Sequence, residues 1–233
     1  MKNPFYFFGT RKPDFRNIYR INYDEYWGKR GLHLNGKLKE REVIMLDRIA
    51  PGSRVLDIGC GNSLLPVMLD KKGVKISVAD ISTVILNLFK EHKISTQYLN
   101  LEDFSSLHFD KRFDYIIMSE VLEHTYNPED IVRSLAKYTD RFIITIPNSG
   151  FYRYRLHLLF SGRFFVQWAH HPSEHIRFWT HSDLMDWFSA LDLVVEEAVA
   201  SNGFSFFGLA PWLKNVWKNL FAYQIVYICH TKK

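Results

Sequence analysis

The stretch Ser53–Asn62, SRVLDIGCGN, decides the fold of this sequence. Three apolar residues around Asp57 predict a short buried strand. Gly59 and Gly61 predict a tight turn, because a helical pattern begins at Leu64 directly after them. A strand, a glycine turn and a helix place backbone N–H groups at the carboxyl edge of a parallel sheet, where open α/β sheets bind nucleotides. An ordinary βα turn gives the same pattern, so other segments must support a ligand.

Strands and helices alternate through the middle of the chain, which is typical of βαβ units and a parallel sheet. The pattern predicts helices at 36–50, 64–72, 82–92 and 128–138, and strands at 54–58, 74–79, 95–99, 113–118 and 141–146. It resumes later with a helix at 181–190 and strands at 193–199 and 223–230. The long connection before the last strand favours an antiparallel final strand.

Two aromatic and basic segments interrupt this alternation. Residues 1–35 suit a cap over a binding cleft or an arm packed on the surface. Residues 148–179 have no clean periodicity and predict a lid insertion over the sheet edge. Cationic and aromatic side chains alternate there. They would either bind a phosphate-bearing or aromatic acceptor or pack against one another as an aromatic lid. They are Arg153, Arg155, Arg163, Arg177, His170 and His171, with Tyr152, Tyr154, Phe164, Phe165 and Trp168.

Composition places the chain among ordinary globular proteins. Its 233 residues suit a single domain over 1–233, and no apolar run approaches the roughly 20 residues of a membrane-spanning helix. No signal peptide is recognisable, and two cysteines do not form a disulfide framework, so we expect a cytoplasmic protein. A net charge of +5 permits an acidic partner without requiring one. The apolar runs at 154–160 and 206–213 leave peripheral membrane contact or a homodimer open.

The glycine turn excludes two kinds of nucleotide. A dinucleotide fingerprint needs a third glycine where this chain has Leu64, and no Walker lysine follows the turn. Asp80 ends the second predicted strand, where an acidic side chain accepts hydrogen bonds from both hydroxyls of a ribose. A ribose without a pyrophosphate is what S-adenosylmethionine presents.

Five segments together resemble the class I S-adenosylmethionine-dependent methyltransferases. They are VLDIGCGN at 55–62, the strand-end Asp80, NLEDF at 100–104, FDYIIMSEVLEH at 113–124 and IITIPN at 143–148. The resemblance implies an α/β, Rossmann-like, mostly parallel seven-stranded sheet of order 3-2-1-4-5-7-6. Strand 7 would be antiparallel, and helices would cover both faces.

The same resemblance implies a cofactor site. The methionine part of S-adenosylmethionine would lie over the turn, Ile81 would pack on adenine, and Asn100, Leu101 or Glu102 would reach its polar edge. Ser63 and Asn100 depart from the residues common in the family. The full expected set is Asp57, Gly59, Cys60, Gly61, Asp80, Ile81, Asn100, Leu101 and Ser119.

The segment Ser119–His124, SEVLEH, supplies the candidate chemistry. Methyl transfer to a hydroxyl needs an aligned acceptor and a base, for which His124 and Glu123 are the candidates. A similar ExxEH occurs in ubiquinone-pathway O-methyltransferases and in metal-dependent small-RNA 2′-O-methyltransferases. The latter resemblance adds His175, so Glu120, Glu123, His124 and His175 would hold Mg²⁺ or Mn²⁺. Many methyltransferases carry LEH without a metal, which leaves the cation open.

The second half of the chain, at 147–168 and 175–184, resembles the MetW family. We therefore expect methyl transfer to a small molecule, such as a hydroxyl of a glycan or of a lipid-linked precursor, with S-adenosylhomocysteine as the product. Two alternatives remain. One is a MetW-like accessory subunit that binds the cofactor and assists a partner enzyme, and the other is a metal-dependent RNA 2′-O-methyltransferase. A nucleic-acid partner is not expected, because no RNA-binding motif accompanies the basic insertion.

Overall fold

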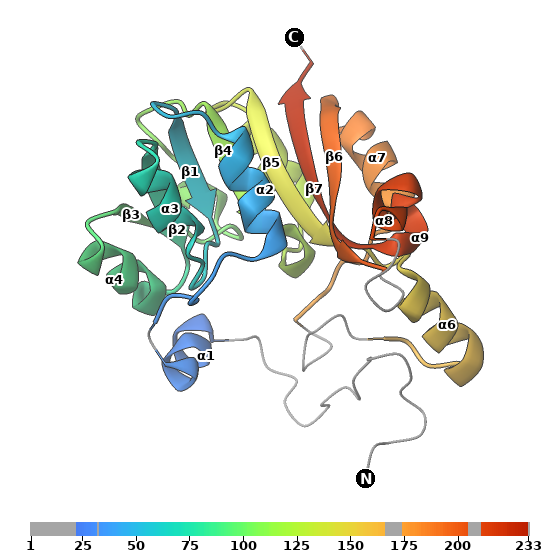
Figure 1. The fold of residues 1–233 in the computed structure, drawn as a ribbon. Coiled ribbons are helices and arrows are strands. Elements are labelled where there is room, and N and C mark those ends of the chain that lie inside the picture. Colours follow the sequence, from blue (N-terminus) through green and yellow to red (C-terminus); the bar gives the residue numbers. More distant parts are fainter. Residues whose placement is uncertain (1–21, 32, 166–173, 205–210, 233) are drawn as a thin grey trace.

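The computed structural model describes residues 22–31, 33–165, 174–204 and 211–232, and within them seven strands form one sheet (Figure 1). The strand order is β3-β2-β1-β4-β5-β7-β6, and β7 runs antiparallel to both of its neighbours. The predicted order and the antiparallel seventh strand are confirmed. The strands are β1 (Arg54–Ile58), β2 (Lys75–Asp80), β3 (Ser95–Tyr98), β4 (Tyr115–Ser119), β5 (Arg141–Pro147), β6 (Leu193–Gly203) and β7 (Ala222–Thr231).

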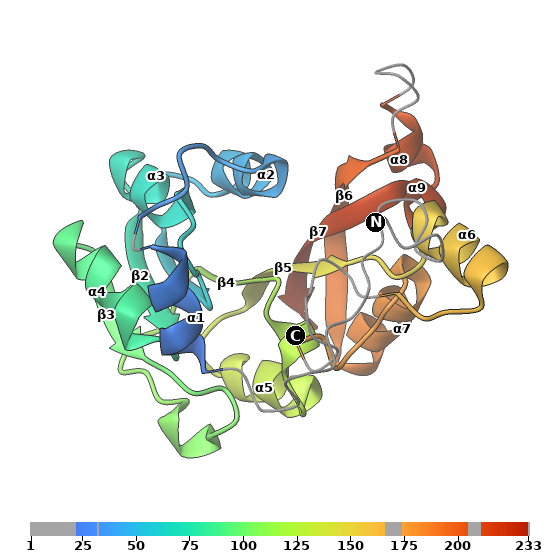
Figure 2. The ribbon, with the colours of Figure 1, turned by 90° about the horizontal axis from the view of Figure 1, so that it is seen from below.

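Helices cover both faces of the sheet, as expected (Figure 2). Successive strand residues point to opposite faces, so Leu56 joins one buried cluster and Val55 the other. The first cluster contains apolar residues of α5 (Pro128–Leu135) and α7 (His181–Ala190). The second contains those of α2 (Glu40–Arg48), α3 (Leu65–Lys71) and α4 (Thr83–Glu91).

Several elements differ from the sequence-based expectation. The N-terminal arm contains α1 (Tyr23–Arg30), and the lid insertion contains α6 (Tyr152–Ser161). The hydrophobic pattern did not predict α6. This helix exposes Leu159 and Phe160, so its apolar residues do not form a stripe along its buried side. β6 extends to Gly203 because its last residues pair with the start of β7. Short helices α8 (Leu213–Val216) and α9 (Lys218–Phe221) and the 3₁₀ turns η1 (Phe104–Ser106) and η2 (Leu122–His124) complete the fold.

Some expected features lie outside the described residues. These are positions 1–21 of the arm, 205–210 of the second apolar run, and Trp168, His170 and His171 of the lid insertion.

Glycine is required at two positions of the turn after β1. Gly59 has a φ of +67°, and a Cβ there would lie 2.6 Å from Cγ2 of Val121 in the loop after β4. Gly61 has a φ of +51°, and a Cβ there would lie 2.9 Å from the indole of Trp27 in α1. The turn is therefore enclosed by two other segments, which only glycines permit.

Asn148 joins three segments beyond the end of β5. Its side chain is 1% exposed, and its Nδ2 donates to the carbonyls of Lys218 at 3.1 Å and Ala222 at 2.8 Å. Its Oδ1 accepts from the N–H groups of Gly150 at 2.9 Å and His181 at 3.2 Å. One amide thus holds the starts of α6 and α7 against the segment that enters β7.

We expect Asn148→Ala to lower the free energy of unfolding by about 3 kcal/mol, because several buried backbone groups would lose their partner. Urea unfolding followed by circular dichroism measures this loss. The matched control is Asn87→Ala at an exposed position of α4, which should change stability by less than about 0.5 kcal/mol. Equal losses in the two variants would contradict the assigned role of Asn148.

Candidate functional site

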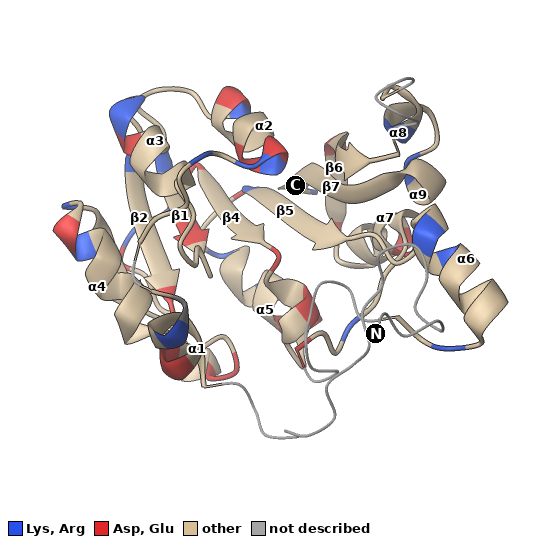
Figure 3. Cartoon of the chain, turned by 60° about the horizontal axis from the view of Figure 1, so that its bottom comes forward, with Lys and Arg blue, Asp and Glu red and all other residues tan. Residues whose placement is uncertain are grey.

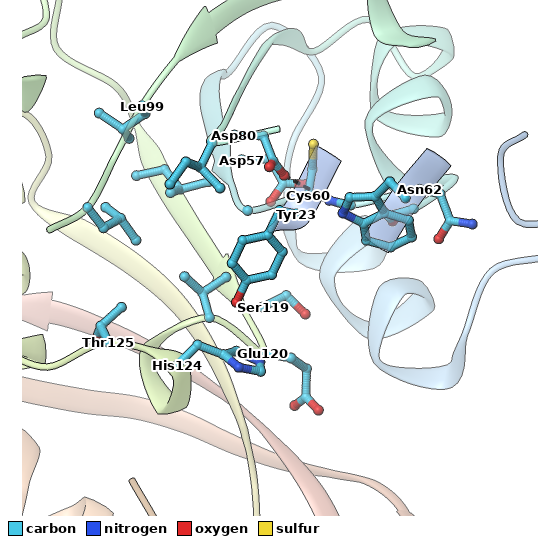
Figure 4. Close-up of a pocket in the computed structure, with 18 of the residues that line it drawn as sticks. Tyr23, Asp57, Cys60, Asn62, Asp80, Leu99, Ser119, Glu120, His124 and Thr125 are labelled. Atoms are coloured by element: carbon cyan, nitrogen blue, oxygen red, sulfur yellow. Dashed lines mark hydrogen bonds between the residues drawn. The ribbon is translucent and has the colours of Figure 1, made fainter. Parts of the chain in front are cut away.

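A cavity of about 590 Å³ opens at the carboxyl edge of β1, β2 and β4 (Figure 4). Segments from α1, α2 and the loops after β1, β2, β3 and β4 line it. All nine residues expected to bind the cofactor lie on its wall: Asp57, Gly59, Cys60, Gly61, Asp80, Ile81, Asn100, Leu101 and Ser119.

Asp80 connects the end of β2 to the glycine turn. Its Oδ2 accepts from the N–H of Gly61 at 3.3 Å, and its Oδ1 accepts from the N–H of Ser82 at 2.9 Å. The side chain is buried, and this burial raises the pKa of Asp80 to about 6. The carboxylate is therefore fixed in direction while it faces the cavity.

Asp57 is also buried, at 2% exposure, and its Oδ1 has no hydrogen-bond partner among the described residues. Burial raises the pKa of Asp57 well above its usual range, and the nearby Glu42 and Asp80 carboxylates add to this effect. A buried acceptor without a donor is costly, so this oxygen is suited to a donor supplied by a ligand.

Residues of the described part of the N-terminal arm line the cavity, and whether the arm acts as a cap stays a prediction. Tyr23, Tyr26 and Trp27 of α1 line the cavity, and Figure 4 shows Tyr23 between the Asp57–Asp80 side and the His124 side. Burial raises the pKa of Tyr23 to about 12, so its hydroxyl stays protonated.

Asp24 holds α1 on the first turn of α4. Its Oδ1 accepts from Ser82 Oγ at 2.7 Å and from the N–H of Val84 at 3.3 Å, and its Oδ2 accepts from Thr83 Oγ1 at 3.1 Å. The hydrogen bond from Ser82 is the main reason that the pKa of Asp24 lies below its usual value. A carboxylate from α1 therefore caps α4, where the helix dipole also favours negative charge.

Three charged residues at the start of α2 also line the cavity, and sequence reasoning missed them. Lys39, Arg41 and Glu42 enter beside Ser119 and the glycine turn. Arg41 Nε donates to Ser119 Oγ at 3.2 Å, and its Nη1 donates to Gln224 Oε1 at 3.3 Å. In the sequence they lie beside the apolar face of an amphipathic helix. Ordinary surface residues occupy the same kind of position, so the sequence did not mark these three as part of a site.

The structure groups three of the four candidate metal ligands. Potential ligand atoms of Glu123, His124 and His175 lie within 4.8 Å of one another. Glu120 lies outside this group, because its carboxylate accepts from Gln224 Nε2 at 2.8 Å and from Thr145 Oγ1 at 3.3 Å. Of the three, His124 lines the cavity and Glu123 and His175 lie behind it.

Glu123 is fully buried, and neither of its carboxylate oxygens has a hydrogen-bond partner among the described residues. Burial raises its pKa well above the usual range, and the nearby Glu120 raises it further. The backbone carbonyl of Glu123 accepts from the N–H groups of Ile176 at 2.9 Å and Arg177 at 3.2 Å. These two bonds bring the end of the lid insertion, with His175, to the loop after β4.

His124 is held in one tautomer. Its Nδ1 donates to the backbone carbonyl of Glu174, so Nε2 is left as the acceptor. The rings of His124 and His175 meet edge to face with centroids 4.7 Å apart. Burial lowers the pKa of His124, and burial together with His124 lowers the pKa of His175 to about 3. Both imidazoles are therefore neutral at pH 7.

Comparison with known proteins agrees with this fold. The chain is 29% identical over 181 residues to the ubiquinone biosynthesis O-methyltransferase of Glaesserella parasuis serovar 5, covering 72% of this chain and 74% of that protein. It is 26% identical over 174 residues to the bifunctional methionine biosynthesis protein MetXA/MetW of Rhodopirellula baltica, covering 68% of this chain and 28% of that protein. The chain thus spans about a quarter of the length of the bifunctional relative.

A solved structure shares the fold across most of both chains. Magnesium protoporphyrin IX methyltransferase of Synechocystis PCC 6803, with bound S-adenosylhomocysteine, matches with a TM-score of 0.60 at 14% identity, over 91% of this chain and 95% of that one. Fold and relatives together define a class I S-adenosylmethionine-dependent methyltransferase. Within that class the chain belongs to the methionine biosynthesis protein MetW family, whose family model matches residues 39–229.

We expect Asp24→Ala to release α1 from α4, because three hydrogen bonds would be lost. Amide hydrogen exchange over 23–30 should accelerate, while exchange in the central strands stays unchanged. Glu25→Ala is the matched control, since Glu25 is exposed and its one ion pair among the described residues is with Lys29 of its own helix. Unchanged exchange in α1 of the Asp24 variant would contradict this attachment.

Proposed function

We propose that the protein transfers a methyl group from S-adenosylmethionine to a hydroxyl of a small molecule, namely a glycan or a lipid-linked precursor. The observation that carries this proposal is the cavity, whose wall contains every residue expected to contact the cofactor. The carboxyl edge of the sheet, where this cavity lies, is where open α/β folds bind their nucleotide ligands.

Each part of the cofactor has a matching group on the wall. The buried Asp80 carboxylate would accept from the ribose hydroxyls, and Ile81 and Leu101 would pack on adenine. The unpartnered Oδ1 of Asp57 would accept from the ammonium of the methionine part. Arg41, beside Ser119, offers a cation for the carboxylate at the same end.

His124 is the proposed base. Its Nε2 is an acceptor, its imidazole is neutral, and the residue lines the cavity beside Ser119 and Glu120. The hydroxyl proton would pass to Nε2 as the acceptor oxygen takes the methyl group and the sulfonium becomes a neutral thioether. Glu123 does not reach the cavity wall, so we assign it as a positioning residue behind His124.

The hydroxyl acceptor is favoured by the relative from Glaesserella parasuis, which is named an O-methyltransferase. The identity of the acceptor is part of the proposal. Purified protein incubated with labelled S-adenosylmethionine and cell extract, fractionated into lipid, glycan and RNA pools, tests it. Label in the lipid or glycan pool supports the proposal, and label in RNA alone would contradict it.

A second candidate uses a divalent cation, and the grouping of Glu123, His124 and His175 favours it. The unpartnered buried carboxylate and two neutral imidazoles form an O,N,N donor set that suits Mn²⁺. A bound cation would acidify the acceptor hydroxyl. Nε2 of His124 would then be a ligand and not a base, so the two assignments exclude each other. The RNA 2′-O-methyltransferase alternative also depends on this cation.

A third candidate is an accessory subunit. Membership of the MetW family favours it, and so does the Rhodopirellula baltica relative, in which MetXA and MetW belong to one bifunctional protein. Binding of S-adenosylhomocysteine without methylation of any extract fraction, followed by an effect on a partner enzyme, would support this candidate over the first.

We expect Asp80→Ala to weaken S-adenosylhomocysteine binding by about 1–3 kcal/mol in calorimetry, because a charge-assisted acceptor for the ribose is lost. Asp70→Ala, an exposed carboxylate on α3, is the matched control and should bind with unchanged affinity. The wild-type affinity should also fall as the pH drops below about 6, where Asp80 takes up a proton and can no longer accept from both hydroxyls. Unchanged affinity in Asp80→Ala would exclude the ribose assignment.

We expect Mn²⁺ to bind if the second candidate is correct, with loss of binding in Glu123→Gln measured by electron paramagnetic resonance. Glu120→Gln is the control, since Glu120 lies outside the group and should leave Mn²⁺ binding unchanged. Absence of Mn²⁺ binding in the wild type, together with methylation that survives EDTA, would reject the cation and retain His124 as the base.

A further inference from the structure

Two segments of the chain contain no acidic residue. No Asp or Glu occurs from 141 to 173 or from 198 to 233, although the whole chain has 25 of them. The first segment leaves the sheet after β5 and the second after β6. β5 and β6 are both antiparallel to β7 and therefore parallel to each other. Their carboxyl ends lie at one edge of the sheet, the edge that also carries the cavity (Figure 1).

The same two segments expose most of the large apolar side chains. Of the twelve such residues among the described ones, seven lie here, and the other five are scattered over the rest of the surface. Leu159 is 73% exposed and Phe160 is 67% exposed. We use the name aromatic edge for six of them: Leu158, Leu159, Phe160, Phe164, Trp212 and Trp217.

The two parts of the aromatic edge are fastened to one another. Asn148 bonds both segments, and Arg155 Nη2 donates to the carbonyl of Asn219 at 3.4 Å. The ring of Tyr152 lies 5.3 Å from that of Phe204 and 6.4 Å from that of Phe221. Figure 2 shows α6, α8 and α9 on the same side of the molecule. The two segments that carry the exposed side chains are therefore linked to one another on one side of the molecule.

Positive charge accompanies this surface. Helices α6, α8 and α9 carry Lys and Arg and no acidic residue (Figure 3). Within the described residues Arg153 and Arg155 form no salt bridge, and their Nε atoms donate to neutral groups, the Tyr152 hydroxyl at 3.1 Å and the Gly150 carbonyl at 2.6 Å. Lys214 is the exception, since it pairs with Glu40.

Exposed Trp, Phe and Leu beside Arg153, Arg155 and Lys218, which form no salt bridge among the described residues, match the boundary of an anionic bilayer. The apolar side chains enter the headgroup and acyl boundary, while guanidinium and ammonium groups meet lipid phosphates. None of the helices in the described ranges has the length and apolarity to cross a bilayer. Contact at this edge would therefore be peripheral.

We propose that the aromatic edge docks the protein on anionic membranes, with the carboxyl edge of the sheet and its cavity turned toward the lipid. A surface for a second copy of the chain would bury the Arg and Lys side chains of α6, α8 and α9 against each other, and these three helices carry no carboxylate of their own to offset that repulsion. The proposal concerns where the protein works and does not depend on which group it methylates, although it suits a lipid-linked acceptor.

Vesicle flotation tests the proposal with the full chain. We expect binding to vesicles of phosphatidylcholine with phosphatidylglycerol, and little binding to phosphatidylcholine alone. Leu159→Gln combined with Phe160→Gln should weaken binding to anionic vesicles at least about tenfold, because two apolar side chains no longer enter the bilayer. Tyr98→Gln is the matched control, since Tyr98 is 54% exposed on β3 and should have no effect.

Calorimetry with S-adenosylhomocysteine separates this proposal from the proposed function. The double variant should keep the wild-type affinity for S-adenosylhomocysteine, which shows that its fold is intact. Vesicle binding that is absent in the wild type, or equal in wild type and double variant, would overturn the proposal. So would a dimer in analytical ultracentrifugation that becomes a monomer in the double variant, since the aromatic edge would then bind a second copy.

Discussion

The site depends on the close packing around the turn after β1. Val121 in the loop after β4 lies so close to this turn that a Cβ at Gly59 would be only 2.6 Å from its Cγ2. From the other direction Asp80 binds the N–H of Gly61. Three loops from neighbouring strands thus share one small volume, and each fixes the others. This close packing sets the relative positions of the carboxylates and of the loop that carries His124.

A second constraint brings a distant segment to the same place. The backbone carbonyl of Glu123 receives two N–H groups from the end of the lid insertion, and His124 binds the carbonyl of Glu174 in return. Backbone bonds of this kind do not depend on side-chain identity at 174–177. The position of His175 beside His124 therefore rests largely on backbone hydrogen bonds.

The fold could be predicted from the sequence because its signals are local. Strand 54–58 and the glycine turn follow from a few adjacent residues, and the strand order followed from the resemblance. The cofactor residues lay at strand ends, where topology alone gathers them. Arg41 and Tyr23 could not be found in this way, because their place in the cavity depends on how α1 and α2 pack across the sheet edge. The separation of Glu120 from Glu123 also depends on three-dimensional contacts, namely those with Gln224 and Thr145, far along the chain.

Attachment of α1 through Asp24 makes one wall of the cavity depend on a helix cap. Tyr23 and Trp27 of α1 line the cavity, and three hydrogen bonds from Asp24 hold their helix on the first turn of α4. A residue that satisfies the end of one helix thus also fixes the aromatic side chains that another helix brings to the cavity.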